Sequence, residues 1–199
     1  MKFYKALDSI KLKKYSEVDK KQFALSFFSK SGFKSSKLFD KELKKKVSNF
    51  FADEKRSSLF LSKELTGLKG DFLVLRDFNK NKSEYKKYAW MKGLFANLDK
   101  YAVKNAVIYA DTSHLFKDDN FLFDLAKTAE KVSYRYTDTN PNTKKELILK
   151  NVSLAVESAS AAQKRVVELG YNVGSGANTA RNLGDRPANH ATPAYIANA

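Results

Sequence analysis

The sequence contains no cysteine and only two histidines, His114 and His190. Without cysteine it can form neither a disulfide framework nor a thiolate metal site, and this absence fits a reducing compartment. A zinc site would need carboxylates to complete it, and Asp118-Asp119 is better placed to cap a helix. Ser113 and His114 are neighbours in one loop, and no G-x-S-x-G nucleophile elbow occurs. We therefore expect neither a catalytic residue nor a metal site within these residues.

Long apolar runs are also missing. No stretch of eighteen apolar residues occurs, so the sequence predicts no membrane span. The N-terminus lacks an apolar segment of signal-peptide length. We expect a cytoplasmic protein that does not associate with membranes.

Acidic residues are outnumbered, with 22 Asp+Glu against 37 Lys+Arg and a net charge of +15. Such a field attracts polyanions, so the sequence predicts weak, salt-dependent DNA binding. Arginine, which is favoured for reading bases and gripping phosphates, occurs only six times. The expected binding is therefore tolerant of DNA sequence, and the alternative is a solvated, lysine-rich surface.

The apolar content of 43%, with fifteen phenylalanines, is enough for a core. Short apolar runs alternate with segments of helical periodicity along the first 150 residues. The runs predict strands at 22–28, 58–61, 71–75, 106–109 and 147–149, and the periodicity predicts helices at 38–52, 83–101 and 122–129. This alternation predicts an α/β fold, with a mixed, largely parallel sheet flanked by helices. Polar Asp111, Thr112 and Ser113 follow one strand, where open α/β sheets place ligands.

Beyond about residue 155 the pattern changes to one long helix, expected from about 159 to 184. Gly174 and Gly176 follow a helical pattern and lack the Walker signature, so they indicate close helix packing rather than a phosphate loop. Pro187 ends the helix, and Thr192-Pro193 predicts the start of another. We expect an α/β domain at 1–155 and a connector at 156–199, with residues 158–199 packed poorly on residues 1–150.

The segment after the long helix carries a family pattern. The matching residues are Ala180, Arg181, Leu183, Pro187, Asn189, Thr192, Pro193, Tyr195, Ile196 and Ala197. This segment resembles the interdomain junction of the leucine aminopeptidase (leucyl aminopeptidase) family, and departs from it at Asn182 and Asp185. A weaker similarity is Tyr134-Arg-Tyr136 followed by Lys144-Lys145.

The resemblance implies a macro-domain-like N-terminal domain, joined by a long connector helix to a catalytic domain. That domain would hold two divalent metal ions, zinc or manganese, through Lys, Asp and Glu, and would remove N-terminal residues from peptides. The family's members are typically cytosolic hexamers, and some bacterial members bind DNA.

None of the family's metal-ligand motifs occurs in residues 1–199, so this chain alone is expected to be inactive. Its main partner would be its own catalytic domain. The junction residues are then expected to be structural, and they are Arg181, Asp185, Pro187, Asn189, Thr192 and Pro193. The alternative is a stand-alone basic α/β module that binds nucleic acid or a nucleotide.

Overall fold

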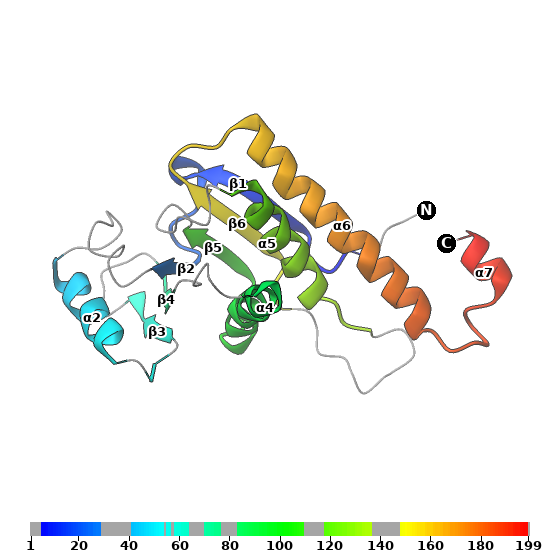
Figure 1. Cartoon of the computed structure of the whole chain (residues 1–199), viewed down its shortest axis with the longest axis horizontal. Helices are drawn as coiled ribbons and strands as arrows, with labels where there is room; N and C mark the ends of the chain where they lie inside the picture. Colours follow the sequence, from blue (N-terminus) through cyan, green and yellow to red (C-terminus); the bar gives the residue numbers. More distant parts are fainter. Residues whose placement is uncertain are drawn as a thin grey trace.

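A single six-stranded sheet with helices on both faces forms the body of the protein (Figure 1). This computed structural model describes residues 5–28, 41–53, 55–56, 58–63, 70–76, 83–109, 118–136 and 148–198. The strands are β1 (Ser9–Lys14), β2 (Phe23–Phe28), β3 (Ser58–Leu61), β4 (Phe72–Arg76), β5 (Asn105–Tyr109) and β6 (Asn151–Val156). The helices are η1 (Tyr15–Glu17), α2 (Lys41–Ala52), α4 (Glu84–Lys100), α5 (Asp119–Val132), α6 (Ala161–Asp185) and α7 (Pro193–Asn198).

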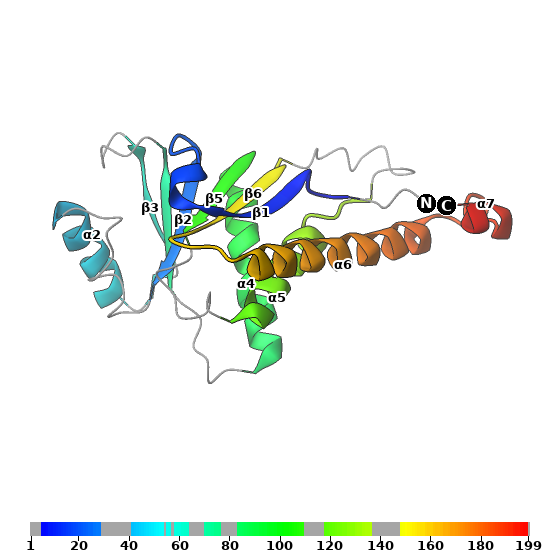
Figure 2. The ribbon, with the colours of Figure 1, turned by 90° about the horizontal axis from the view of Figure 1, so that it is seen from above.

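The strand order is β1-β6-β5-β2-β4-β3. Every neighbouring pair is parallel except β3 and β4, which are antiparallel. The predicted mixed, largely parallel sheet is therefore confirmed. Figure 2 shows α4, α5 and α6 on one side of the sheet and α2 on the other.

The larger core lies between the sheet and the layer of α4, α5 and α6. Along α4 and at its C-cap, Tyr88, Met91, Phe95, Leu98 and Tyr101 recur at helical spacing, which predicts a buried stripe. Met91, Phe95 and Leu98 are buried in this core, whereas Tyr88 is exposed. Ser83 directly precedes α4 as expected, although its side chain makes no capping hydrogen bond. Asp118 does cap α5, because its Oδ1 accepts a hydrogen bond from the Asn120 backbone N–H at 2.9 Å.

A smaller core lies under α2 on the opposite face. Leu43, Val47, Phe50 and Phe51 of this helix are all buried, and their i, i+4, i+7 and i+8 spacing places them on one helical face. The helix begins at Lys41 within the described residues, so the predicted start near Leu38 is not tested.

Two strands differ from expectation. The strand predicted at 147–149 is wrong, because Ile148 and Leu149 precede β6, which begins at Asn151. β1 was not predicted, although Ile10 and Leu12 alternate with lysines in the two-residue period of a strand. β1 and β6 contain polar residues that interrupt their apolar runs, so neither strand is evident from a continuous apolar segment.

Some of these polar residues are paired across the sheet. The Ser9 hydroxyl donates to Asn151 Oδ1 at 2.8 Å, and Asn151 Nδ2 donates to Asn105 Oδ1 at 2.9 Å. This chain of hydrogen bonds links β1, β6 and β5 at equivalent positions, and so compensates the burial of amide groups in the sheet.

Several expectations concern residues outside the described ranges. These are the polar residues Asp111, Thr112, Ser113 and His114, the loop that Asn140-Pro141 predicts at 137–143, and the pair Lys144-Lys145. Among the helices that the structure describes, none is both long and apolar enough to cross a membrane.

Candidate functional site at the helix junction

Clustered metal ligands are not found in the described part of the chain, which has no group of three or more His, Cys, Asp or Glu side chains able to hold an ion. His190 lies in the turn after α6, where its backbone N–H donates to the Pro187 carbonyl at 2.8 Å. The best-defined candidate features are instead the contact between α6 and α5 and the turn that follows α6.

α6 packs closely along α5, in the most extensive contact between any two described elements. Gly170 and Gly174 make this approach possible. A Cβ at Gly170 would collide with the Phe123 carbonyl oxygen, and one at Gly174 would lie 2.8 Å from the Glu130 Cβ. The expectation that residues 158–199 pack poorly is therefore wrong for this part of α6. The expected packing role of the glycines is confirmed for Gly174 but not for Gly176, where an added Cβ would meet no other described residue within 4 Å.

A buried carboxylate ties the N-terminal segment to these two helices. Glu130 of α5 has no exposed surface, and its Oε1 and Oε2 accept the backbone N–H groups of Ala6 at 2.6 Å and Leu7 at 2.8 Å. Asn178 of α6 donates to the Glu130 carbonyl at 2.8 Å and to Oε1 at 3.2 Å. The Glu130 side chain of α5 thus links the segment that precedes β1 to α6.

Tyr171 adds a second bond to the same segment, because its hydroxyl donates to the Leu7 carbonyl at 2.7 Å. Burial, together with the negative charge of Glu130, raises the pKa of Tyr171 to about 12, so it remains a donor at physiological pH. Burial also raises the pKa of Glu130, against the opposing effect of the backbone N–H groups and the Lys5 charge. Asn178 Oδ1 is buried without a hydrogen-bond partner among the described residues.

The C-terminal end of α6 brings together two sequence features that lie about fifty residues apart. Arg181 Nη1 donates to the Lys131 carbonyl at 3.0 Å, and its guanidinium lies 5.1 Å from the centre of the Tyr134 ring. The Tyr134 hydroxyl donates to Asp185 Oδ2 at 2.8 Å. Both Arg181 and Asp185 were singled out from the sequence, and Tyr134 belongs to the second, weaker similarity. The structure places all three in one cluster.

The remaining junction residues shape the chain rather than forming a pocket. Pro187 accepts backbone hydrogen bonds from His190 and Ala191, which closes the turn. Thr192 caps α7, since its hydroxyl accepts the Tyr195 backbone N–H at 3.2 Å, and Pro193 is the first residue of that helix. The helix start predicted at Thr192-Pro193 is confirmed. Asn189 is exposed in the turn.

The outer side of α6 carries exposed apolar side chains. Leu169 is 56% exposed and Val173 is 44% exposed, while Val167 and Tyr171 on the inner side are buried. The sequence predicts an apolar face on this helix, formed by Val166, Leu169, Val173, Ala177 and Ala180, that lacks part of its partner in this chain. Leu169, Val173 and Ala180 are exposed in agreement with this, whereas Val166 packs against the larger core. Tyr195 and Ile196 of α7 are also exposed.

Sequence reasoning missed Glu130 and Asn178. A signal existed for Glu130, because it lies four residues after Ala126 and therefore continues the apolar stripe of α5. A carboxylate on an apolar stripe is expected to be paired, but its partners, Ala6 and Leu7, offer only backbone groups and leave no trace in the sequence.

Comparisons with known proteins found similarity in fold. No protein-family model matches the chain, and no curated protein matches it. Among solved structures, a mutant of tomato leucine aminopeptidase superposes with a TM-score of 0.65 at 15% identity, over 96% of this chain and 40% of that one. An apo leucyl aminopeptidase from Trypanosoma brucei gives 0.60 at 11% identity, over 99% of this chain and 41% of that one. The chain therefore has the fold of about two fifths of these enzymes.

Proposed function

We propose that this chain is the N-terminal, non-catalytic part of a metal-dependent leucyl aminopeptidase, with α6 as the connector to a catalytic domain. The observation that carries the proposal is the fold, because nearly the whole chain, connector included, superposes on part of two aminopeptidases. In this proposal the catalytic domain, with two zinc or manganese ions, removes N-terminal residues from peptides, and the full protein is a cytoplasmic hexamer.

The surface of α6 and α7 supports this proposal. One side of α6 is fixed to the domain through Gly170, Gly174 and Glu130, whereas Leu169 and Val173 are exposed on the other side. Exposed apolar side chains beside a rigid junction suit contact with a further domain. Arg181, Asp185 and Tyr134 then hold the direction in which the chain leaves the α/β domain.

The proposal is tested by the coding sequence downstream of residue 199. We expect it to encode a domain with the lysine and carboxylate ligands of a two-metal site. A stop codon after residue 199, or an unrelated downstream domain, would favour the alternative of a stand-alone basic α/β module.

We expect the purified 199-residue chain to hydrolyse no leucine anilide, with or without added zinc or manganese. The reason is that the described residues bring no ligand cluster together. The measurement is release of the anilide chromophore at enzyme concentrations far above those used for aminopeptidases. Metal-dependent turnover above a heat-denatured control would contradict the division of roles proposed here.

Weak DNA binding is a separate expectation that rests on the net charge of +15. We expect the affinity for a labelled duplex to fall steeply between about 50 and 200 mM salt, because lysines release counterions from phosphates. Titrations of two unrelated duplexes should give equal affinities. An affinity that does not change with salt concentration, or a strong preference for one duplex, would show that the net charge is not the cause of the DNA binding.

A further inference from the structure

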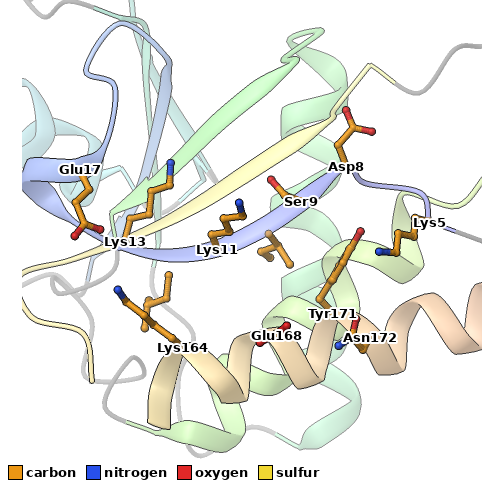
Figure 3. Close-up of a pocket in the computed structure, with 12 residues that line it drawn as sticks. Lys5, Asp8, Ser9, Lys11, Lys13, Glu17, Lys164, Glu168, Tyr171 and Asn172 are labelled. Atoms are coloured by element: carbon orange, nitrogen blue, oxygen red, sulfur yellow. The ribbon is translucent and has the colours of Figure 1, made fainter. Parts of the chain in front are cut away.

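A groove of about 550 Å³ runs along β1, beside the N-terminal half of α6. β1 is the last strand at one edge of the described sheet, so its outer side has no neighbouring strand there. Lys164, Glu168, Tyr171 and Asn172 line the wall on α6, at the spacing of one helical face. Figure 3 shows these side chains opposite β1.

The unpaired edge of β1, with α6 beside it as a wall, suits an extended peptide. An extended peptide can add to the edge as a further strand, using the backbone groups of β1, while its side chains contact the helix. The floor is apolar, because Ile10 and Leu12 line the groove from β1. The length of β1, Ser9–Lys14, allows pairing with about six peptide residues.

The charges of the groove favour an acidic peptide. Lys5, Lys11, Lys13 and Lys164 all line it, and none of them forms a salt bridge with a described residue. Lys5 instead lies 5.6 Å from the centre of the Tyr171 ring. In Figure 3 the amino groups of Lys11 and Lys13 rise from β1 on the side away from α6.

Lys11 and Lys13 also set a spacing. They are two residues apart and therefore share one face of the strand. Side chains directly opposite them on an added strand would likewise be two residues apart, close enough for cross-strand ion pairs. Acidic residues at alternate positions of the peptide would match both lysines, and the intervening residues would face the apolar floor.

A nucleic acid fits this groove less well. Asp8, Glu17 and Glu168 also line it and would repel phosphates, whereas a peptide can direct neutral residues toward them. Among the described residues that line the groove there is no arginine, and the one aromatic ring, Tyr171, is only 7% exposed with its hydroxyl bonded to Leu7. Single strands are usually held by exposed rings on which bases stack.

We infer that the groove between β1 and α6 is a docking site for an extended acidic peptide segment, which adds as a strand to β1 and pairs alternate Asp or Glu residues with Lys11 and Lys13. This function goes beyond the proposed role in an aminopeptidase and does not depend on a catalytic domain. It requires only residues that the described α/β body already positions.

The first test measures binding of a fluorescent ten-residue peptide with alternating Glu and Val to the full 199-residue chain. We expect saturable binding, with at least tenfold loss of affinity in Lys11→Glu/Lys13→Glu. The matched control is Lys86→Glu/Lys92→Glu, two exposed lysines of α4 outside the groove, which changes the net charge equally. An equal loss of peptide affinity in both double variants would show that only the net charge matters, and it would overturn the inference. Lys11→Gln/Lys13→Gln gives the same comparison if the charge reversal unfolds the chain.

The second test separates strand addition from charge attraction. Two versions of the peptide carry N-methyl groups on alternate sets of backbone amides, so that only one set would face β1. We expect one version to lose at least tenfold in affinity and the other to bind nearly as the parent does. If both versions bind like the parent, or if an oligodeoxynucleotide of equal charge displaces the peptide and still binds the Lys11→Glu/Lys13→Glu variant, the groove is not a peptide site.

Discussion

Replacing Glu130 with alanine should lower the free energy of unfolding by about 3 kcal/mol or more. The substitution leaves two buried donors, the backbone N–H groups of Ala6 and Leu7, without their acceptor, and it removes one of the two acceptors of the Asn178 amide. A buried donor that loses its partner costs about 1–3 kcal/mol. Urea unfolding followed by circular dichroism measures the difference.

Glu130→Gln is the matched control, because it keeps the shape and one carbonyl acceptor but loses the charge. Burial raises the pKa of Glu130 in the folded chain above its value in the unfolded chain. The stability linked to protonation of this carboxyl is therefore fully present below the unfolded-state pKa and is lost as pH rises through the folded-state pKa. The natural chain should therefore lose stability over this interval relative to Glu130→Gln. A parallel pH dependence of the two proteins would show that folding does not raise the pKa of Glu130. A loss below about 1 kcal/mol in Glu130→Ala would show that the bonds to Glu130 contribute little.

Gly170→Ala and Gly176→Ala should change stability in opposite directions, although both glycines lie within α6. A Cβ at residue 170 would meet the backbone of α5 at Phe123 and lie 3.2 Å from the Ala126 Cβ, so the helices must separate. Overpacking of this kind costs about 1–3 kcal/mol. A Cβ at residue 176 would meet no described atom within 4 Å outside its own helix backbone, and alanine there should stabilise the helix by about 0.5–1 kcal/mol.

Thermal and urea unfolding of the two variants make the comparison, with hydrogen exchange of α6 as a local readout. Gly170→Ala should speed hydrogen exchange in α6 relative to β2 and β4, because the added methyl group disturbs the packing of α6 on α5. If both alanine variants stabilise the chain, α6 does not pack on α5 as closely as the structure places it.

Local periodicity predicted most of the fold. α2, α4 and α5 place their apolar residues at helical spacing, and β2, β4 and β5 are buried apolar runs, so each is visible in a short window. β1 and β6 carry Lys11, Lys13, Asn151 and Ser153 on the face away from the main helix layer. These polar residues break the apolar runs, and their hydrogen bonds or solvent exposure are decided by distant parts of the chain.

The junction shows a similar limit. Its turn and helix start depend on Pro187, Thr192 and Pro193, whose conformational preferences are local. The binding of Arg181 and Asp185 to Tyr134 could not be predicted, because it depends on how α6 lies against α5. The face of α6 that packs on α5 was not predicted, because its glycines and Asn178 give no apolar signal, whereas Leu169 and Val173 are exposed as expected. The division into 1–155 and 156–199 stays a prediction.

The pairing of β1 with β6 has a consequence for biosynthesis. Ser9 and its partner Asn151 are 142 residues apart, and Leu7 and Tyr171 are 164 apart. β1 leaves the ribosome before the other described strands and therefore waits until most of the described sheet has been made before it can dock, because contacts so distant in sequence form late. During that wait β1 is an unpaired amphipathic segment, and its lysines act as gatekeepers that discourage association with other nascent chains. The same lysines that would select a docking partner in the folded protein thus protect the strand before the sheet is complete.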